Sequence, residues 1–126
     1  MSPEELDTAL TLRTALARYE ELRARDLFED EEHEPLSRTE ALEMIALGEV
    51  IARKARNGRQ LAVRTARERG ASWSQIGRAL GTSKQTAWET HNRWIDQQAE
   101  QRRDAGHWGL DEAEVARERK LAGRPD

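Results

Sequence analysis

The predicted fold is decided by residues 72–89, which read Ser-Trp-Ser-Gln-Ile-Gly-Arg-Ala-Leu-Gly-Thr-Ser-Lys-Gln-Thr-Ala-Trp-Glu. This pattern predicts a short helix, a three-residue turn and a second helix. Helices joined this closely need a small residue where they touch and a glycine where the backbone turns with positive φ, and Gly77 and Gly81 occupy these places. Serines at the N-cap positions and small or apolar residues on the inward faces complete the pattern: Ser72, Ser83, Ile76, Leu80, Thr82 and Ala87.

Charge is strongly segregated along the 126-residue chain, although its formal net charge is only −3. Residues 1–52 hold 14 acidic and 5 basic side chains, residues 53–93 hold 2 and 10, and residues 94–126 hold 8 and 6. The middle third is therefore basic, as a protein that binds a polyanion requires, and acidic segments flank it.

Residues 72–89 resemble the helix-turn-helix DNA-binding proteins of bacteria, in particular small actinobacterial ones with the stretch W-x-x-I-G-x-A-L-G-x-S-[KR]-Q-x-A-W. The resemblance covers residues 61–96 and implies that residues 83–95 form the recognition helix, which enters a major groove of double-stranded DNA. It also implies that residues 73–80 form the supporting helix. Thr90 stands where many such motifs carry a larger aliphatic residue, so we expect the missing apolar face to come from Trp88, His91, Trp94 and Ile95.

The chemistry of the side chains divides the candidate DNA-binding residues into two groups. Gln85 suits an adenine edge, Lys84 suits guanine or phosphate, and Glu89 accepts from cytosine, with Thr86 and Asn92 as further base-reading candidates. The second group binds phosphates and adds affinity without sequence information. It comprises the arginines Arg64, Arg67, Arg78 and Arg93 and the serines at two helix N-termini, Ser72 and Ser83.

The N-terminal third predicts one helix from Pro3 to about Arg25, followed by an acidic segment, residues 29–35. Like charges and Pro35 break the helical pattern there, so we interpret the segment as a solvated linker. A cation site, or a cover for the basic face in the absence of DNA, is the alternative. The apolar stripe of the helix has no partner within its own segment, so it packs on the rest of the chain or on a second copy, which suggests a homodimer: Leu6, Leu10, Leu16 and Tyr19.

The remaining segments also predict helices, and nothing predicts a strand. Ser37 and Glu40 have the spacing of a capping box, so a helix begins near Arg38 and continues to about Arg69, unless Asn57-Gly58 divides it into two. The helix that begins at residue 83 should end near Ala105-Gly106, and Asp111 should cap a last helix, residues 112–121, which docks as a small arm or frays.

We therefore predict an all-α protein, elongated or dimeric, with a long N-terminal helix and a helix-turn-helix. The predicted parts are an N-terminal helix with its acidic linker (residues 1–35), a DNA-binding domain (residues 36–100) and a C-terminal linker with a short helix (residues 101–126).

Several classes of protein are disfavoured. The chain has no cysteine, its three histidines are scattered, and it has neither a Gly-rich phosphate loop nor a Gly-x-Ser-x-Gly elbow, so we expect no enzyme, no metal and no cofactor. No apolar run reaches the roughly 18 residues that a membrane span requires, and no signal peptide is recognisable. We expect a cytoplasmic, nucleoid-associated protein with no membrane partner. At helical spacing Trp73, Trp88 and Trp94 favour core positions over base stacking, and His91 favours a helix position over a metal ligand.

The functional hypothesis is sequence-specific binding of double-stranded DNA, as in a transcriptional regulator. Two alternatives stay open. An adaptor of the anti-sigma type would use the acidic first third as the contact surface for a protein partner. A nucleoid-type architectural protein would use its arginines on phosphates with little sequence preference.

Overall fold

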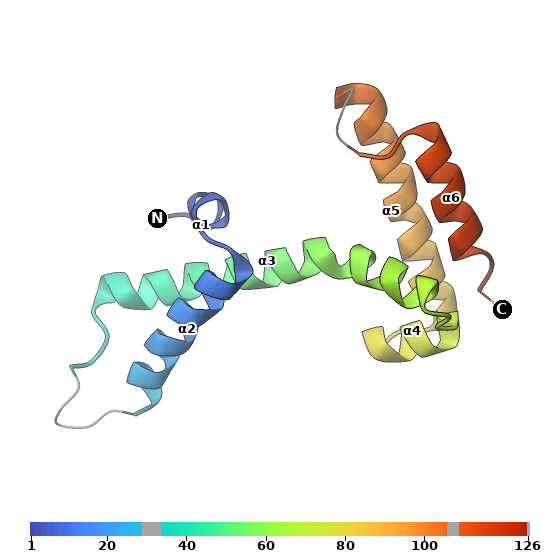
Figure 1. Cartoon of the computed structure of the whole chain (residues 1–126). Coiled ribbons are helices and arrows are strands. Elements are labelled where there is room, and N and C mark those ends of the chain that lie inside the picture. Colours follow the sequence, from blue (N-terminus) through green and yellow to red (C-terminus); the bar gives the residue numbers. More distant parts are fainter. Residues whose placement is uncertain (29–33, 106–108, 126) are drawn as a thin grey trace. The chain divides into compact units, whose positions relative to one another are not determined.

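The computed structural model describes residues 1–28, 34–105 and 109–125, which form helices without any strand (Figure 1). The all-α prediction is therefore confirmed for these residues. The predictions for the acidic run, residues 29–33, and for a helix end at Gly106 lie outside them. The helices are α1 (Pro3–Ala9), α2 (Leu12–Leu27), α3 (Arg38–Glu68), α4 (Trp73–Leu80), α5 (Lys84–Ala105) and α6 (Glu112–Ala122). None of these helices combines the length and the apolar character needed to cross a membrane.

The chain divides into two compact units, unit 1 (Met1–Gly58) and unit 2 (Arg59–Asp126). Helix α3 supplies residues to both units. The predicted boundaries were after residues 35 and 100, and the single boundary of the structure lies after residue 58. The reason is that α1 and α2 pack on the first part of α3, and α6 packs on α5.

Unit 1 begins with two helices, so the prediction of a single helix from Pro3 to Arg25 is wrong. Leu10 is extended, with φ −119° and ψ 148°, and Thr11 starts α2 as an N-cap that exchanges hydrogen bonds with Thr14. A threonine that satisfies the first amides of a new helix makes this break favourable.

The predicted apolar stripe of unit 1 packs within the chain. Leu6, Leu10 and Tyr19 lie against a core of four fully buried residues, Ala15, Leu22, Leu47 and Val50, the last two of which belong to α3. Only Leu16 of the predicted stripe is exposed, at 41 %. The stripe therefore does not need a second copy of the chain to cover it.

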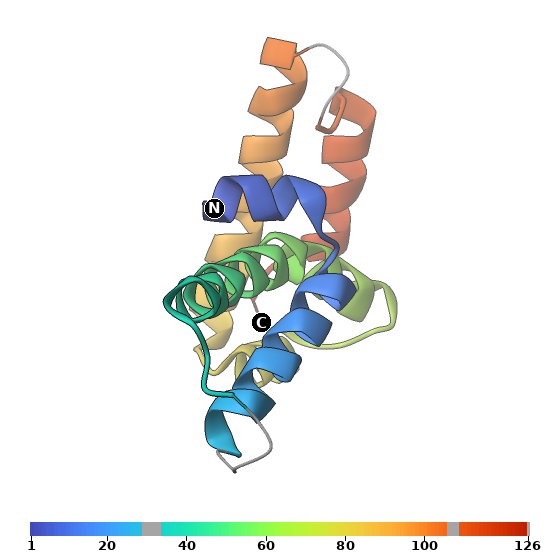
Figure 2. The same cartoon turned by 90° about the vertical axis from the view of Figure 1, so that its left-hand side faces the viewer.

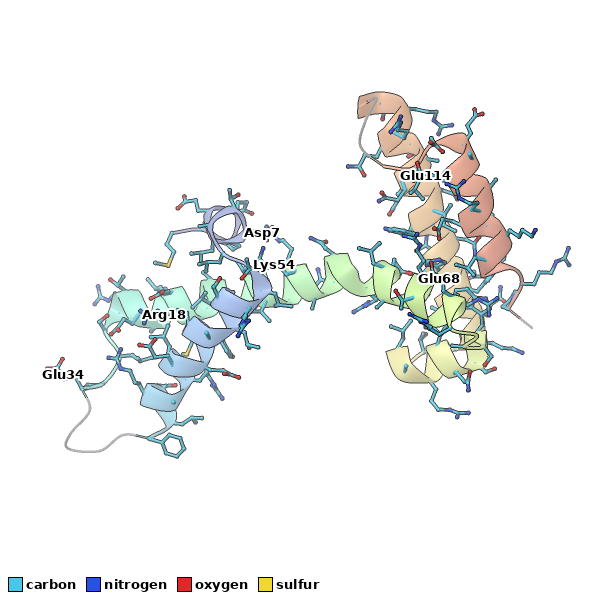
Figure 3. The ribbon with its side chains drawn as sticks, in the orientation of Figure 1. Asp7, Arg18, Glu34, Lys54, Glu68 and Glu114 are labelled. Carbon is cyan, nitrogen blue, oxygen red and sulfur yellow. The ribbon has the colours of Figure 1, made fainter. Side chains whose placement is uncertain are left out.

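Ion pairs fix the register of the helices in unit 1. Arg18 donates from Nε and Nη2 to the two carboxylate oxygens of Glu43, at 2.9 Å each, and Arg25 donates to both oxygens of Glu40 at 2.6 and 3.3 Å. The hydrogen bonds from Arg25, with that from the Ser37 backbone, lower the pKa of Glu40 to about 2. Lys54 ties α1 to α3, with its Nζ 2.7 Å from Asp7 Oδ1 (Figure 3).

The Ser37–Glu40 capping box is confirmed, because the Glu40 amide donates to Ser37 Oγ and the Ser37 amide donates to Glu40 Oε1, both at 3.1 Å. Helix α3 then continues through Asn57-Gly58, so the single-helix prediction is confirmed and the two-helix alternative is wrong.

Unit 2 contains a second hydrophobic core, which consists of Val63, Trp73, Ile76, Ala87, Ile95 and Ala122. His91 is 1 % exposed, and Trp88 and Trp94 pack partly buried against this core, so the predicted apolar face beside Thr90 is confirmed. Helices α5 and α6 run side by side and antiparallel (Figures 1 and 2). Asp111 caps α6 as predicted, accepting from the Glu114 amide at 2.8 Å.

Candidate nucleic-acid interface

The connection between α4 and α5 is short and tightly packed. Gly81 ends α4 with φ 74°, in the left-handed region that glycine tolerates. Gly77 is buried, and a Cβ added there would lie 2.9 Å from backbone atoms of both Thr82 and Ser83. The predicted roles of both glycines are confirmed. Because the turn packs directly on the backbone of α4, the start of α5 is held in a defined position.

The two predicted N-cap serines also have their expected places. Ser72 Oγ accepts from the Gln75 backbone amide at 3.1 Å, and Gln75 Oε1 accepts from the Ser72 backbone amide at 2.9 Å. Ser83 Oγ accepts from the Thr86 backbone amide at 3.0 Å.

The prediction that Leu80 and Thr82 face inward is wrong, because both are exposed, Leu80 at 36 %. The chain reverses at Gly81, which leaves both side chains at the surface of the turn.

Helix α5 has a buried face and an exposed polar face. Residues at a spacing of four share a face of a helix, and Ala87, His91 and Ile95 form the buried one. Gln85, Glu89 and Arg93, displaced by two positions, are exposed. Gln85 Nε2 donates to Glu89 Oε1 at 2.7 Å, so these two predicted base-reading side chains form a pair.

The other predicted base-reading residues differ in how exposed their side chains are. Lys84 and Thr86 are exposed in the first turn of α5, where the Thr86 hydroxyl lies 3.0 Å from Ser83 Oγ. Asn92 is half-buried, and its Nδ2 donates to the Trp88 carbonyl of the preceding turn at 2.9 Å. The most accessible predicted readers therefore lie in the first two turns of α5, ahead of Asn92.

Among the predicted phosphate ligands, Arg78 and Arg93 are exposed, on α4 and α5 respectively. Arg64 and Arg67 instead make contacts inside unit 2. Arg64 Nε lies 2.8 Å from Oε1 of the buried Glu118 and 3.3 Å from Glu68, which Figure 3 marks. We therefore remove Arg64 and Arg67 from the candidate interface.

The C-terminal end of α6 is held by side chains from three other helices. Arg67 donates from Nε and Nη2 to the Leu121 carbonyl at 3.1 and 3.0 Å, Trp73 Nε1 donates to the Ala122 carbonyl at 2.7 Å, and Trp88 Nε1 donates to the Gly123 carbonyl at 2.7 Å. The last carbonyls of a helix have no partner within the helix, so these donors cap α6 and also connect it to α3, α4 and α5. Of the two predicted alternatives for this helix, docking is the one observed.

His91 is a packing residue. Its ring stacks on Trp94 at a centroid distance of 5.4 Å, lies 5.7 Å from the Trp73 ring, and has Nδ1 2.9 Å from Gln60 Oε1. Burial, with a smaller effect from the charge of Arg67, lowers the pKa of His91 to about 4. The ring is therefore neutral near pH 7, and the helix position predicted for His91 is a packed one.

No protein-family model matches the chain, and no curated protein or solved structure is significantly similar to it. The resemblance of residues 72–89 to bacterial helix-turn-helix proteins thus rests on the motif itself.

Proposed function

We propose that the chain binds double-stranded DNA in a sequence-specific manner through α4 and α5, as a transcriptional regulator does. The observation that carries the proposal is the exposed, polar start of α5, which a glycine-packed turn holds against α4. Lys84, Gln85, Thr86 and Glu89 all lie on this surface, and their chemistry matches the edges of bases in a major groove.

A helix fits into the major groove of B-form DNA, and the side chains of its first turns reach the base edges. In the free protein Gln85 and Glu89 satisfy one another. On binding, Gln85 would exchange this partner for an adenine edge, and Glu89 would accept from a cytosine amino group. Arg78 and Arg93 flank these residues and would bind phosphates.

The basic middle of the chain supports the same proposal. Residues 53–93 hold 10 basic and 2 acidic side chains, and the Glu68 carboxylate already pairs with Arg64. A positive local field of this kind attracts a polyanion even when the whole protein is slightly acidic.

Homodimerisation stays a prediction, but its basis changes. Exposed apolar side chains of unit 1, such as Leu27 at 62 %, Phe28 at 71 % and Ile45 at 65 %, now offer the surface for a second copy. A dimer would place two α5 helices on a palindromic site. A monomer by sedimentation at high micromolar concentration would contradict it.

Selection of bound sequences from random duplex DNA tests the proposal directly. A sequence-specific protein should yield a preferred site and keep it under an excess of random competitor duplex. An architectural protein should bind without a preferred site, and an adaptor should bind no duplex at moderate salt. Either of the last two outcomes would refute sequence-specific binding.

The proposed division of roles predicts different effects for two substitutions. Gln85→Ala should relax the preference at one base position, at a cost of about 1–3 kcal/mol in discrimination. Arg78→Ala should weaken binding to all duplexes alike and lower the salt dependence by about one phosphate contact. Arg13→Ala, an exposed site on α2 in unit 1, is the matched control. Identical behaviour of the Gln85 and Arg78 variants would contradict the division.

A further inference from the structure

An open groove of about 590 Å³ lies beside the exposed face of α5, and none of the roles described above uses it. One wall is formed by Gln85, Trp88 and Asn92 of α5. The other is formed by Arg119 of α6 and by the segment that follows it, Gly123, Arg124 and Pro125. A predicted base-reading residue, Gln85, thus shares a groove with two arginines.

The second wall has a defined position because the chain is held immediately before Arg124. The Gly123 carbonyl accepts from Trp88 Nε1, and the Ala122 carbonyl accepts from Trp73 Nε1, both at 2.7 Å. Trp73 is 1 % exposed, and Trp88 packs against the same core, so both donors are fixed. Arg124 therefore leaves the core of unit 2 next to the first turns of α5.

The lining of the groove suits an anion. Its charged side chains are Arg119 and Arg124, its amides belong to Gln85 and Asn92, and none of the lining residues is acidic. Arg119 pairs with Asp96 on α5, whereas Arg124 is exposed. The carbonyls at the C-terminal end of α6, which would repel an anion, already accept from Arg67, Trp73 and Trp88.

We propose that this groove binds the phosphate backbone of the same DNA duplex, with Arg124 as a phosphate ligand beside the base that Gln85 reads. The inference rests on the proposed function. A helix in a major groove has a sugar-phosphate strand on each side. Helix α4, with Arg78, meets α5 through Gly77 at the turn, and the groove opens on the side of Trp88 and Asn92.

The test compares the full-length chain with Arg124→Ala, Arg124→Lys and the control Arg117→Ala. Arg117 is an exposed arginine of α6 outside the groove, so its loss changes the net charge by the same amount. Binding to the selected duplex and to a random-sequence duplex is measured by fluorescence anisotropy over a series of salt concentrations.

Arg124→Ala should weaken binding to both duplexes several-fold, on the order of five, and reduce the slope of log K against log salt by about 0.9. Arg124→Lys should keep most of the slope, Arg117→Ala should match the wild type, and the preferred base at each position should not change. If the wild type binds and Arg124→Ala binds equally well with the same slope, the groove assignment is wrong and the proposed function survives. If the wild type binds neither duplex, both fail.

Discussion

A single methyl group added at Gly77 would disturb the junction of α4 and α5. In Gly77→Ala the new Cβ would lie 2.9 Å from backbone atoms of the turn, which cannot move aside as a flexible side chain can. We expect a loss of about 1–3 kcal/mol in the free energy of unfolding, as for other overpacked sites, together with weaker DNA binding. Urea unfolding followed by tryptophan fluorescence measures the first effect.

Gly58→Ala provides the matched control, because nothing lies within 4 Å of a Cβ added at this helical position. Alanine is the better helix former, so this variant should gain about 0.5–1 kcal/mol. Equal changes in the stability of the two variants would show that the close approach of the turn to Gly77 does not affect the free energy of unfolding.

The buried ring of His91 predicts a pH dependence of stability. The pKa of His91 is about 4 in the folded chain against 6.5 for an ordinary histidine, so between these two pH values the unfolded state binds more protons. Stability should therefore fall as the pH drops from 6.5 towards 4, by about 3 kcal/mol over the whole interval. Urea unfolding between pH 7.5 and 5 covers the upper part of this interval.

His91→Gln isolates the contribution of the ring, because an amide side chain does not titrate. Arg25 and Arg18 also lower the pKa values of Glu40 and Glu43 respectively. Because the wild type and His91→Gln both contain these carboxylates, their effect cancels in the difference between the two stabilities. The difference in stability between wild type and variant should shrink on acidification. A difference that is constant with pH would mean that His91 is not the titrating group.

Residues with a strictly local role could be predicted from the sequence. Gly81 and Ser83 act within a few positions of themselves, so spacing alone identifies them. Leu80 was misplaced because its apolar character says nothing of where the chain reverses, and reversal at the next residue leaves it exposed.

At the scale of elements, Arg67 is expected to hold α6 in place. Its guanidinium donates to two carbonyls, those of Leu121 and Ala71, and lies 5.2 Å from the centre of the Trp73 ring. Arg67→Met keeps the aliphatic length but leaves both carbonyls without this donor, at a cost of about 2–4 kcal/mol. Hydrogen exchange of the α6 amides should rise with it.

Arg69→Met is the control, since Arg69 is exposed in the turn that directly follows α3. It should change neither the unfolding midpoint nor the exchange of α6. If Arg67→Met leaves α6 as protected as Arg69→Met does, the helix is held by its apolar contacts alone.

The helices themselves were mostly predictable, and their contacts were not. Capping residues gave the start of α3 and α6, because a cap acts three residues along the chain. Arg64 and Arg67 were predicted as phosphate ligands, and their contacts with α6 could not be foreseen. Glu118 and Leu121 each lie 54 positions later in the chain, and no local pattern connects an arginine to a distant carboxylate or carbonyl.

At the scale of the whole molecule, two cores predict two separable responses. All the tryptophans follow residue 59, so tryptophan fluorescence reports on unit 2. Leu22→Ala creates a cavity in the core of unit 1 and should cost about 2–5 kcal/mol there. Helix content followed by circular dichroism should then be lost in part at lower urea, while the fluorescence midpoint stays that of the wild type.

Ile95→Ala, in the core of unit 2, should instead move the fluorescence midpoint to lower urea. If Leu22→Ala moves both signals to lower urea together, unit 1 and unit 2 unfold in one cooperative transition and are not independent in stability.

The three donors that hold the end of α6 have a consequence for the order of folding. Arg67, Trp73 and Trp88 reach acceptors 54, 49 and 35 positions further along the chain, at the end of unit 2. The ion pairs of Arg18, Arg25 and Lys54 in unit 1 span 25, 15 and 47 positions, and all of them lie within the first 58 residues. Contacts between distant positions close long loops and form late. During synthesis, unit 1 can complete its pairs while residues 112–125 are still absent, and unit 2 must wait for them. The segment that we assign to the phosphate groove is thus also the last part of the chain that unit 2 needs in order to fold.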